Sequence, residues 1–104
     1  MPKIINTVAE FDEEIKQGNV VCDFFATWCM PCRKMGEIIE AVELTKSDVK
    51  FIKVDVDKLP EIAQRYGVYS IPQVNFIKDG ADKGKFVGVH YESDFVKFID
   101  KAFN

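Results

Sequence analysis

The stretch NVVCDFFATWCMPCRKMGEII, residues 19 to 39, joins two hydrophobic patterns of different period and holds all three cysteines of the chain. Its first eight residues are almost continuously apolar, which is typical of a short strand buried on both faces. From Pro31 to about Lys46 the apolar residues recur at helical spacing, and proline is tolerated in the first turn of a helix. Cys29 and Cys32 are therefore predicted to lie where a buried strand passes into a helix.

Strand and helix patterns alternate on both sides of this junction. The predicted order is β-α-β-α-β-α-β-β-α, with strands at 3–5, 19–26 and 49–56, two more within 71–89, and helices within 6–18, 31–46, 58–68 and 93–103. This alternation predicts right-handed crossovers and a sheet whose first part is parallel. A closing hairpin, turning at Asp79 and Gly80, adds antiparallel edge strands. The fold class is thus α/β, a central mixed five-stranded sheet flanked by helices, with the reactive groups beyond the carboxyl ends of its strands.

Short local signals indicate where the helices begin and end. Thr7 followed by Glu10 matches a capping box, and Ser93 is a suitable N-cap for the last helix. Gly18 and Gly67 are placed to end the first and third helices, because glycine readily adopts the left-handed backbone conformation found just after helices.

Length and composition are those of one soluble globular domain over residues 1–104, since 47% of the residues are hydrophobic and 30% are charged. The net charge is −3 and the basic residues are scattered, which argues against a nucleic-acid partner. No segment approaches the roughly 18 apolar residues that a membrane span needs, and the N-terminus lacks the apolar run of a signal peptide. The odd number of cysteines also suits a reducing compartment, so we expect a cytoplasmic protein with no membrane partner.

Cys29 and Cys32 could bind a metal, form a structural disulfide or act as a redox pair. A structural zinc site takes four nitrogen or sulfur ligands, and the chain offers only Cys22, in mid-strand, and a single histidine, His90, as further soft ligands. A disulfide across two residues closes too small a loop to constrain the unfolded chain much. The residues therefore favour redox chemistry and no metal site.

The strand-to-helix junction would activate one of the two thiols. If Cys29 directly precedes the helix, its sulfur faces unpaired backbone N–H groups and the positive end of the helix dipole, which favour the thiolate. A helix terminus contributes about 0.3 to 1 kcal/mol, whereas lowering a thiol pKa by one unit takes about 1.4 kcal/mol. We expect a hydrogen bond from the Cys32 thiol to supply the remainder. Cys32 points into the helix and is expected to be less exposed, which assigns Cys29 as the nucleophile and Cys32 as the resolving thiol.

Several motifs, in order, resemble those of the thioredoxin family. WCMPC after DFFA is similar to the W-C-G-P-C active-site segment of that family, with Asp23 six residues before Cys29 and Pro31 inside the motif. YGVYSIP leading to Pro72, FIKDG in the hairpin and Gly88 in FVGV follow in the same order. The resemblance spans the whole chain and implies the thioredoxin fold.

The resemblance also implies roles for individual residues. Pro72 corresponds to a cis-proline that packs opposite the two sulfurs and leaves the backbone of Ile71 free to bind an extended substrate chain. Asp23, a carboxyl group in an apolar strand, is costly to bury unless its pKa rises or it finds a partner, and its implied role is to accept the proton of Cys32. Lys53 falls where some family members place a lysine near that acid, although a solvated strand lysine is an equal alternative.

The complete set of implied site residues has a catalytic and a substrate-binding part. The catalytic residues are Cys29, Cys32, Asp23 and Pro31, the substrate-binding residues are Trp28, Met30, Ile71, Pro72 and Gly88, and Lys53 supports proton transfer. Trp28 is expected to shield the site and contact substrate. Met30 replaces the usual glycine of the family, which bears on the redox potential. Gly36 and Glu37 stand where many relatives have a proline that kinks the helix, so we expect a local bend or fray at Gly36.

The predicted function is a protein-disulfide reductase and electron carrier. Cys29 attacks a disulfide in another protein, Cys32 closes an intramolecular disulfide, and a thioredoxin reductase, implied by the family, restores the dithiol. We expect a monomer without a bound cofactor, since the chain has no room for a flavin or nucleotide domain. A thiol oxidant or disulfide isomerase remains an alternative because of Met30. A non-catalytic binding module or a glutathione-dependent enzyme is a weaker alternative, since the cysteine motif is intact and no glutathione-binding residues are recognisable.

Overall fold

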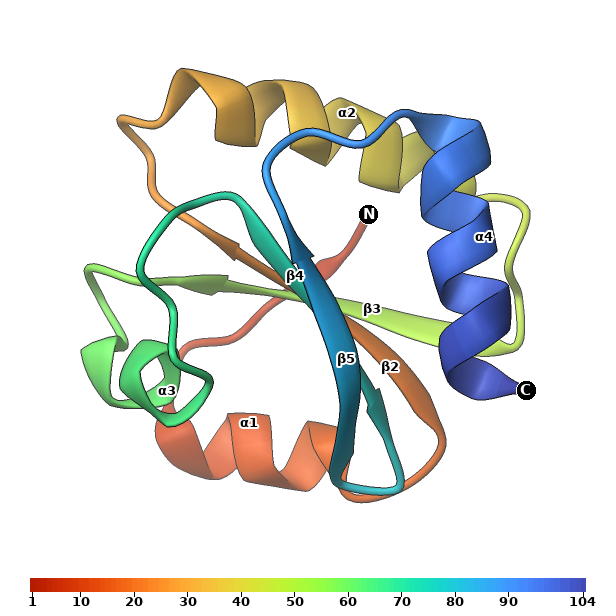
Figure 1. The fold of residues 1–104 in the computed structure, drawn as a ribbon. Coiled ribbons are helices and arrows are strands. Elements are labelled where there is room, and N and C mark those ends of the chain that lie inside the picture. Colours follow the sequence, from red (N-terminus) through yellow and green to blue (C-terminus); the bar gives the residue numbers. More distant parts are fainter.

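The computed structural model describes residues 1–104 and arranges them as a central sheet with helices on both sides (Figure 1). The strands are β1 (Lys3–Ile4), β2 (Asn19–Phe25), β3 (Val49–Asp55), β4 (Gln73–Lys78) and β5 (Ala81–Val87). The helices are α1 (Val8–Ile15), α2 (Met30–Glu43), α3 (Pro60–Arg65) and α4 (Glu92–Phe103). The element order and the mixed five-stranded sheet predicted from the sequence are confirmed.

The strand order places β2, the strand that leads to the cysteines, at the centre of the sheet. The order is β1-β3-β2-β4-β5, in which β1 and β2 run parallel to β3, while β4 is antiparallel to both β2 and β5. Because β2 has a hydrogen-bonded neighbour on each side, its polar backbone is satisfied and nearly all of its side chains are buried. The hairpin therefore supplies only one edge strand, β5, since β4 pairs directly with β2.

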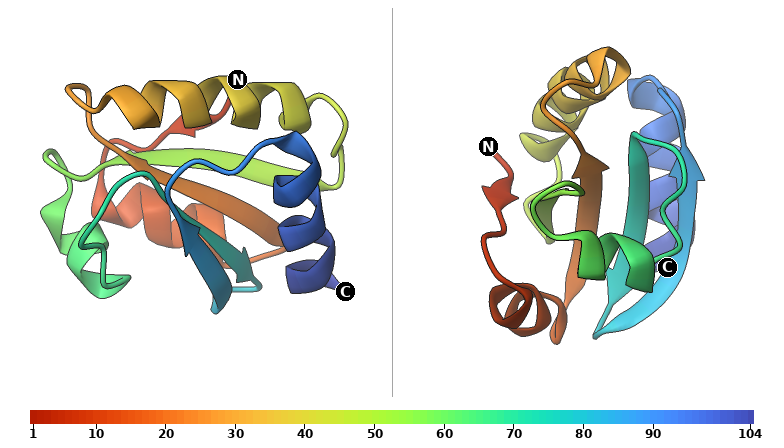
Figure 2. Two further views of the ribbon diagram at one scale, coloured as in Figure 1. Left: turned by 45° about the horizontal axis from the view of Figure 1, so that its top comes forward. Right: turned by 90° about the vertical axis from the view of Figure 1, so that its left-hand side faces the viewer.

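Two helices cover each face of the sheet (Figure 2). Side chains of α2 and α4, such as Met35 and Phe95, pack with Phe76 on one face. Phe11 of α1 packs with Phe24 on the other face, which α3 also covers. Successive strand residues point to opposite faces, so a continuously apolar strand fills both cores at once. No helix combines the length and the apolar character that a membrane crossing requires.

The local signals at α1 and α3 act largely as predicted. The Oγ1 of Thr7 accepts a hydrogen bond from the backbone N–H of Glu10 at 3.0 Å, which caps α1. The Glu10 carboxylate reaches back to the N–H of Asn6 at 2.6 Å, one residue before the N–H that a capping box would use. Gly67 follows α3 with a φ of +62°, the left-handed conformation expected of a glycine at this position.

Two predicted helix boundaries were wrong. The N-cap of α4 is Tyr91 rather than Ser93, because the chain is still extended at Tyr91 and its carbonyl already accepts the N–H of Phe95 at 2.9 Å. Gly18 does not directly cap α1, which ends earlier, at Ile15. Instead Gly18, with a φ of +81°, turns the chain into β2 and exchanges two hydrogen bonds with Asp79 in the hairpin turn. The position of Gly18 is thus decided by a tertiary contact, which local sequence does not report.

Candidate active site

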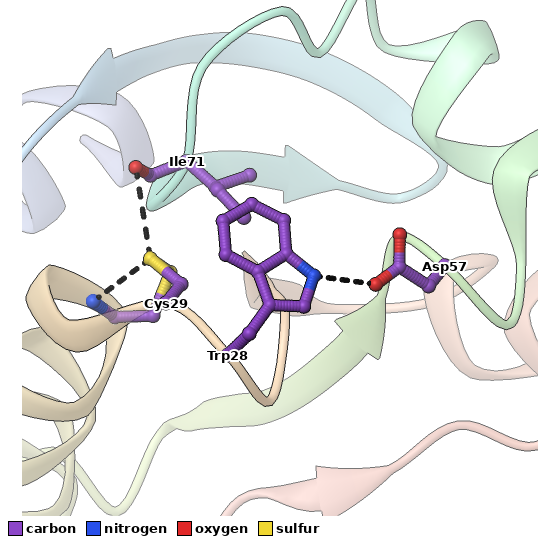
Figure 3. The surroundings of a disulfide bond; sticks show 5 residues. Trp28, Cys29, Asp57 and Ile71 are labelled. Atoms are coloured by element: carbon purple, nitrogen blue, oxygen red, sulfur yellow. Dashed lines mark hydrogen bonds between the residues drawn. A yellow bond between two sulfur atoms is a disulfide. The ribbon is translucent and has the colours of Figure 1, made fainter.

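The two cysteines of the CMPC motif lie beyond the carboxyl end of β2, where the chain turns into α2. Cys29 is the N-cap of α2, with extended backbone angles of φ −89° and ψ 110°. Its Sγ accepts a hydrogen bond from the backbone N–H of Cys32 at 3.2 Å (Figure 3). A sulfur thus occupies the position at which an oxygen of serine, threonine or aspartate caps most helices. Cys29 and Cys32 are joined in a disulfide, the state expected after one turnover.

The two sulfurs differ in their neighbours rather than in their burial. Cys29 and Cys32 are each only 4% exposed, so the expectation that Cys32 is the less exposed one does not hold in this disulfide state. Both belong to one apolar cluster, against which Ile71 packs. The Sγ of Cys29 lies 3.9 Å from the carbonyl oxygen of Ile71. Cys32, in contrast, lines a cavity that also contains Asp23, and Cys29 does not.

The peptide bond between Ile71 and Pro72 is cis, as the family resemblance implied. Pro72 is buried, and its carbonyl accepts the N–H of Gly88 at 2.8 Å. Gly88 has a φ of +89°, which side-chain-bearing residues rarely adopt. Ile71 precedes the paired residues of β4, and no backbone hydrogen bond outside the sheet uses its N–H or C=O. The polar backbone of Ile71 is thus left available beside the disulfide.

Exposed apolar side chains surround the buried disulfide. Trp28 is 68% exposed and Met30 is 66% exposed, which is unusual for such large apolar residues. The indole N–H of Trp28 donates a hydrogen bond to Oδ2 of Asp57 at 2.8 Å (Figure 3). Asp57 is itself oriented, because its backbone N–H donates to Oδ1 of Asp55 at 2.9 Å. Asp57 was not identified from the sequence, although its position just after β3, at the carboxyl edge of the sheet, was an available signal.

Asp23 is a buried acid whose protonation changes near neutral pH. It lies in β2, is 2% exposed, and its Oδ1 has no hydrogen-bond partner. Burial raises the pKa of this carboxyl to about 7, against the opposing attraction of Lys53. Lys53 is the residue directly across from Asp23 in β3, and its Nζ lies 4.3 Å from the centre of the Phe25 ring. The register therefore brings Lys53 to the acid, which sequence spacing alone left open.

A cavity of about 360 Å³ brings Asp23, Cys32 and Lys53 together. It lies between the carboxyl end of β2 and the first turns of α2, and exposed residues of that helix also line it. A carboxyl group with a pKa of about 7 that lines the same cavity as a thiol of the redox pair has the properties of a general base. The arrangement can therefore support proton transfer at Cys32.

The remaining candidates from the sequence lie apart from this arrangement or at its border. Cys22 belongs to the core on the α1 side of the sheet, and burial raises the pKa of its thiol well above the usual range. His90 packs its ring against Phe86, with the ring centres 4.5 Å apart. Pro31 is exposed in the first turn of α2. The chain has no group of three or more histidine, cysteine, aspartate or glutamate side chains arranged to hold a metal ion.

Comparisons with known proteins agree with this geometry. The sequence model of the family described as Thioredoxin matches residues 2–101. A thioredoxin of Rickettsia bellii is 38% identical over 97 residues, which cover 90% of this chain and 92% of the relative. A thioredoxin of Mycoplasmoides gallisepticum is 44% identical over 87 residues, which cover 83% and 87% of the two chains. The solved structure of Plasmodium falciparum thioredoxin superimposes with a TM-score of 0.89 at 34% identity, covering 95% of this chain and 97% of the other.

Proposed function

The chain belongs to the thioredoxin family of protein-disulfide reductases, and we propose that Cys29 is its nucleophile and Cys32 its resolving thiol. The observation that carries this assignment is the placement of Cys29 at the N-cap of α2. There the Cys32 backbone N–H, 3.2 Å from Sγ of Cys29, and the positive end of the helix dipole both stabilise a negative charge on that sulfur. Cys32 lies one turn further into the helix, beside the cavity that contains Asp23.

The proposed reaction moves two electrons from the dithiol to a substrate disulfide. The Cys29 thiolate attacks one substrate sulfur, which forms a mixed disulfide and releases the other substrate sulfur as a thiolate. Cys32 gives its proton to the Asp23 carboxylate, and the resulting Cys32 thiolate attacks Sγ of Cys29. The second substrate sulfur leaves as a thiolate, the intramolecular disulfide closes, and Asp23 retains the proton. A thioredoxin reductase, the partner that the family implies, then returns two electrons to the disulfide.

Disulfide-containing proteins are the substrates that the family implies, and we assign their contact surface to the rim of the disulfide. The N–H and C=O of Ile71, which no other backbone group uses, can pair with an extended substrate segment in the manner of an added strand. The exposed surfaces of Trp28 and Met30 offer apolar contacts on either side of Cys29. Pro72 and Gly88 shape the base of this surface through the hydrogen bond that joins them.

Insulin reduction by dithiothreitol tests the function and the roles of both cysteines. The wild-type protein in catalytic amounts should accelerate precipitation of the insulin B chain, and Cys29→Ser should abolish the acceleration. Cys32→Ser should accumulate a mixed disulfide between Cys29 and the substrate, visible by mass spectrometry and released by reductant. Cys22→Ala is the matched control and should retain activity, because Cys22 lies apart from the disulfide, in the core on the α1 side of the sheet. A mixed disulfide formed by Cys32 in the Cys29→Ser protein would contradict the assignment.

The redox potential distinguishes the reductase from the alternative of a thiol oxidant or disulfide isomerase. Met30, exposed between the two cysteines, is the residue that keeps this alternative open. Equilibration with glutathione or dithiothreitol should give a potential near the value of about −270 mV known for thioredoxins, rather than about −180 to −120 mV. The proposal also includes a monomeric state and a cytoplasmic location, where the buried thiol of Cys22 would stay reduced. Sedimentation and cell fractionation test these two points.

A further inference from the structure

We propose that the cavity beside Asp23 is the route by which the proton taken from Cys32 reaches bulk water, and that Gly36 keeps this route open. The inference rests on the proposed role of Asp23 as the proton acceptor. A buried acid that accepts a proton in each turnover must return that proton to solvent before the next one.

The cavity reaches from the buried acid to the surface of the protein. Its buried end is lined by Asp23 and Cys32, whose side chains are 2% and 4% exposed. Its outer end is lined by exposed residues of α2, namely Arg33, Glu37 and Glu40. A volume of about 360 Å³ has room for several water molecules, each of which takes about 30 Å³ in the liquid. The Oδ1 of Asp23 has no partner within the protein, so water in the cavity is the partner that would satisfy it.

Gly36 also lines this cavity, although the fold does not require a glycine at this position. It lies within α2, which continues without interruption through it, so the expected fray is absent. Its φ is not positive, and a glycine in a helix interior costs about 1 kcal/mol relative to alanine. A Cβ atom at this position would meet no heavy atom within 4 Å. Neither backbone conformation nor close packing therefore requires glycine, and the space that the missing side chain leaves open is cavity space.

Charged groups around the cavity provide a path outward, and one of them, the ammonium of Lys53, lowers the pKa of Asp23. They are Lys53 from β3 and Arg33, Glu37 and Glu40 from α2, with the thiol of Cys32 as a further titratable group. The neighbour of Asp23 in β4 is Val74, which carries no charge. The carboxylates at the mouth can accept the proton from cavity water and pass it to a buffer base. In this step the Asp23 carboxyl becomes a carboxylate, a water chain carries the proton outward, and no electrons move.

The test places a larger side chain at Gly36 to fill the cavity. Formation of the mixed disulfide and closure of the intramolecular disulfide are then measured separately. Gly36→Leu should leave formation of the mixed disulfide within twofold of the parent when it is introduced into Cys32→Ser protein, because Cys29 does not line the cavity. With both cysteines present, disulfide closure over repeated turnovers, monitored by rapid alkylation of free thiols, should slow at least fivefold at pH 7, because an Asp23 that keeps its proton cannot accept the next one. Its pH midpoint should also move upward, because removing water from around Asp23 disfavours the charged carboxylate. Gly36→Ala should give a smaller effect in the same direction.

Three further variants provide a control, a second way to fill the cavity, and a separate test of Asp23. Ala41→Leu, on the same helix but not lining the cavity, is the matched control and should keep the wild-type pH profile. If Gly36→Leu does not fold, Gly36→Met fills the same space with an unbranched, more adaptable side chain. Asp23→Asn separates the two proposals, because normal disulfide closure in that variant overturns the role of Asp23 itself. If Asp23→Asn slows closure while Gly36→Leu and Gly36→Met retain the wild-type rate and pH midpoint, only the proton route is refuted.

Discussion

Replacing Asp23 by asparagine should stabilise the protein by an amount that grows with pH. Burial raises the pKa of this carboxyl from 3.8 to about 7 in the folded protein, with Lys53 opposing the rise. Between these pH values the folded state holds one more proton than the unfolded chain, so wild-type stability falls as the pH rises. At about 1.4 kcal/mol for each pH unit, the loss reaches about 4 kcal/mol above pH 7 and then levels off. Asparagine is also polar and similar in size, but it cannot ionise.

The measurement is urea unfolding of the oxidised wild-type and Asp23→Asn proteins at pH 5, 6, 7 and 8. The free-energy difference between the two should increase by about 1.4 kcal/mol per unit up to pH 7 and change little above it. Taking the difference cancels the pH dependence of all other groups. Asp48→Asn, at an exposed position, is the control and should show no comparable increase. A difference for Asp23→Asn that is constant with pH would refute the reasoning, because a general packing change does not titrate.

Three further substitutions test the contacts around the site. Lys53→Met removes the ammonium that lowers the pKa of Asp23, so the pH midpoint of disulfide closure should move upward, as measured by stopped-flow kinetics; an unchanged midpoint would contradict it. Asp57→Ala removes the 2.8 Å hydrogen bond to Trp28, which should lower kcat/KM for insulin severalfold but change the free energy of unfolding by less than about 1 kcal/mol, since both side chains are exposed. Gly88→Ala places a side chain at a φ of +89° and should cost about 1 to 2 kcal/mol, measured as a lower Tm; an unchanged Tm would show that the strain is absent.

The part of the site that the sequence predicts well is the part that local patterns encode. The change from a continuously apolar run to helical spacing places Cys29 and Cys32 at the end of β2 and the start of α2. The capping preference of helices then gives Cys29 its position, because the residue before the first turn is the one whose side chain can accept a backbone N–H. Gly67 ends α3 for an equally local reason, its left-handed conformation. These features depend on a few neighbouring residues only.

Features that depend on the meeting of distant segments are less accessible from the sequence. Asp57 contacts Trp28 across 29 positions of the chain, and nothing in the local pattern of either residue indicates the partner. The cis bond before Pro72 followed from the family resemblance, since most bonds before proline are trans. The equal burial of the two cysteines was not foreseen either, because it depends on residues from other segments, Val56 and Ile71, that pack against the cysteine cluster. Each case depends on contacts between distant segments, which a single sequence does not state directly.

Several residues that lower the stability of the folded protein lie close to the Cys29–Cys32 disulfide. A buried Asp23 costs the folded state about 4 kcal/mol above pH 7, where an apolar side chain in the central strand would cost nothing comparable. Gly36 weakens α2 without a backbone reason, and Trp28 leaves most of its surface in water although the neighbouring core is apolar. All three lie within one turn of the Cys29–Cys32 pair or share its cavity. Selection for stability alone would remove such residues, and their concentration around one disulfide is what the proposed proton transfer and substrate contact at that disulfide would produce.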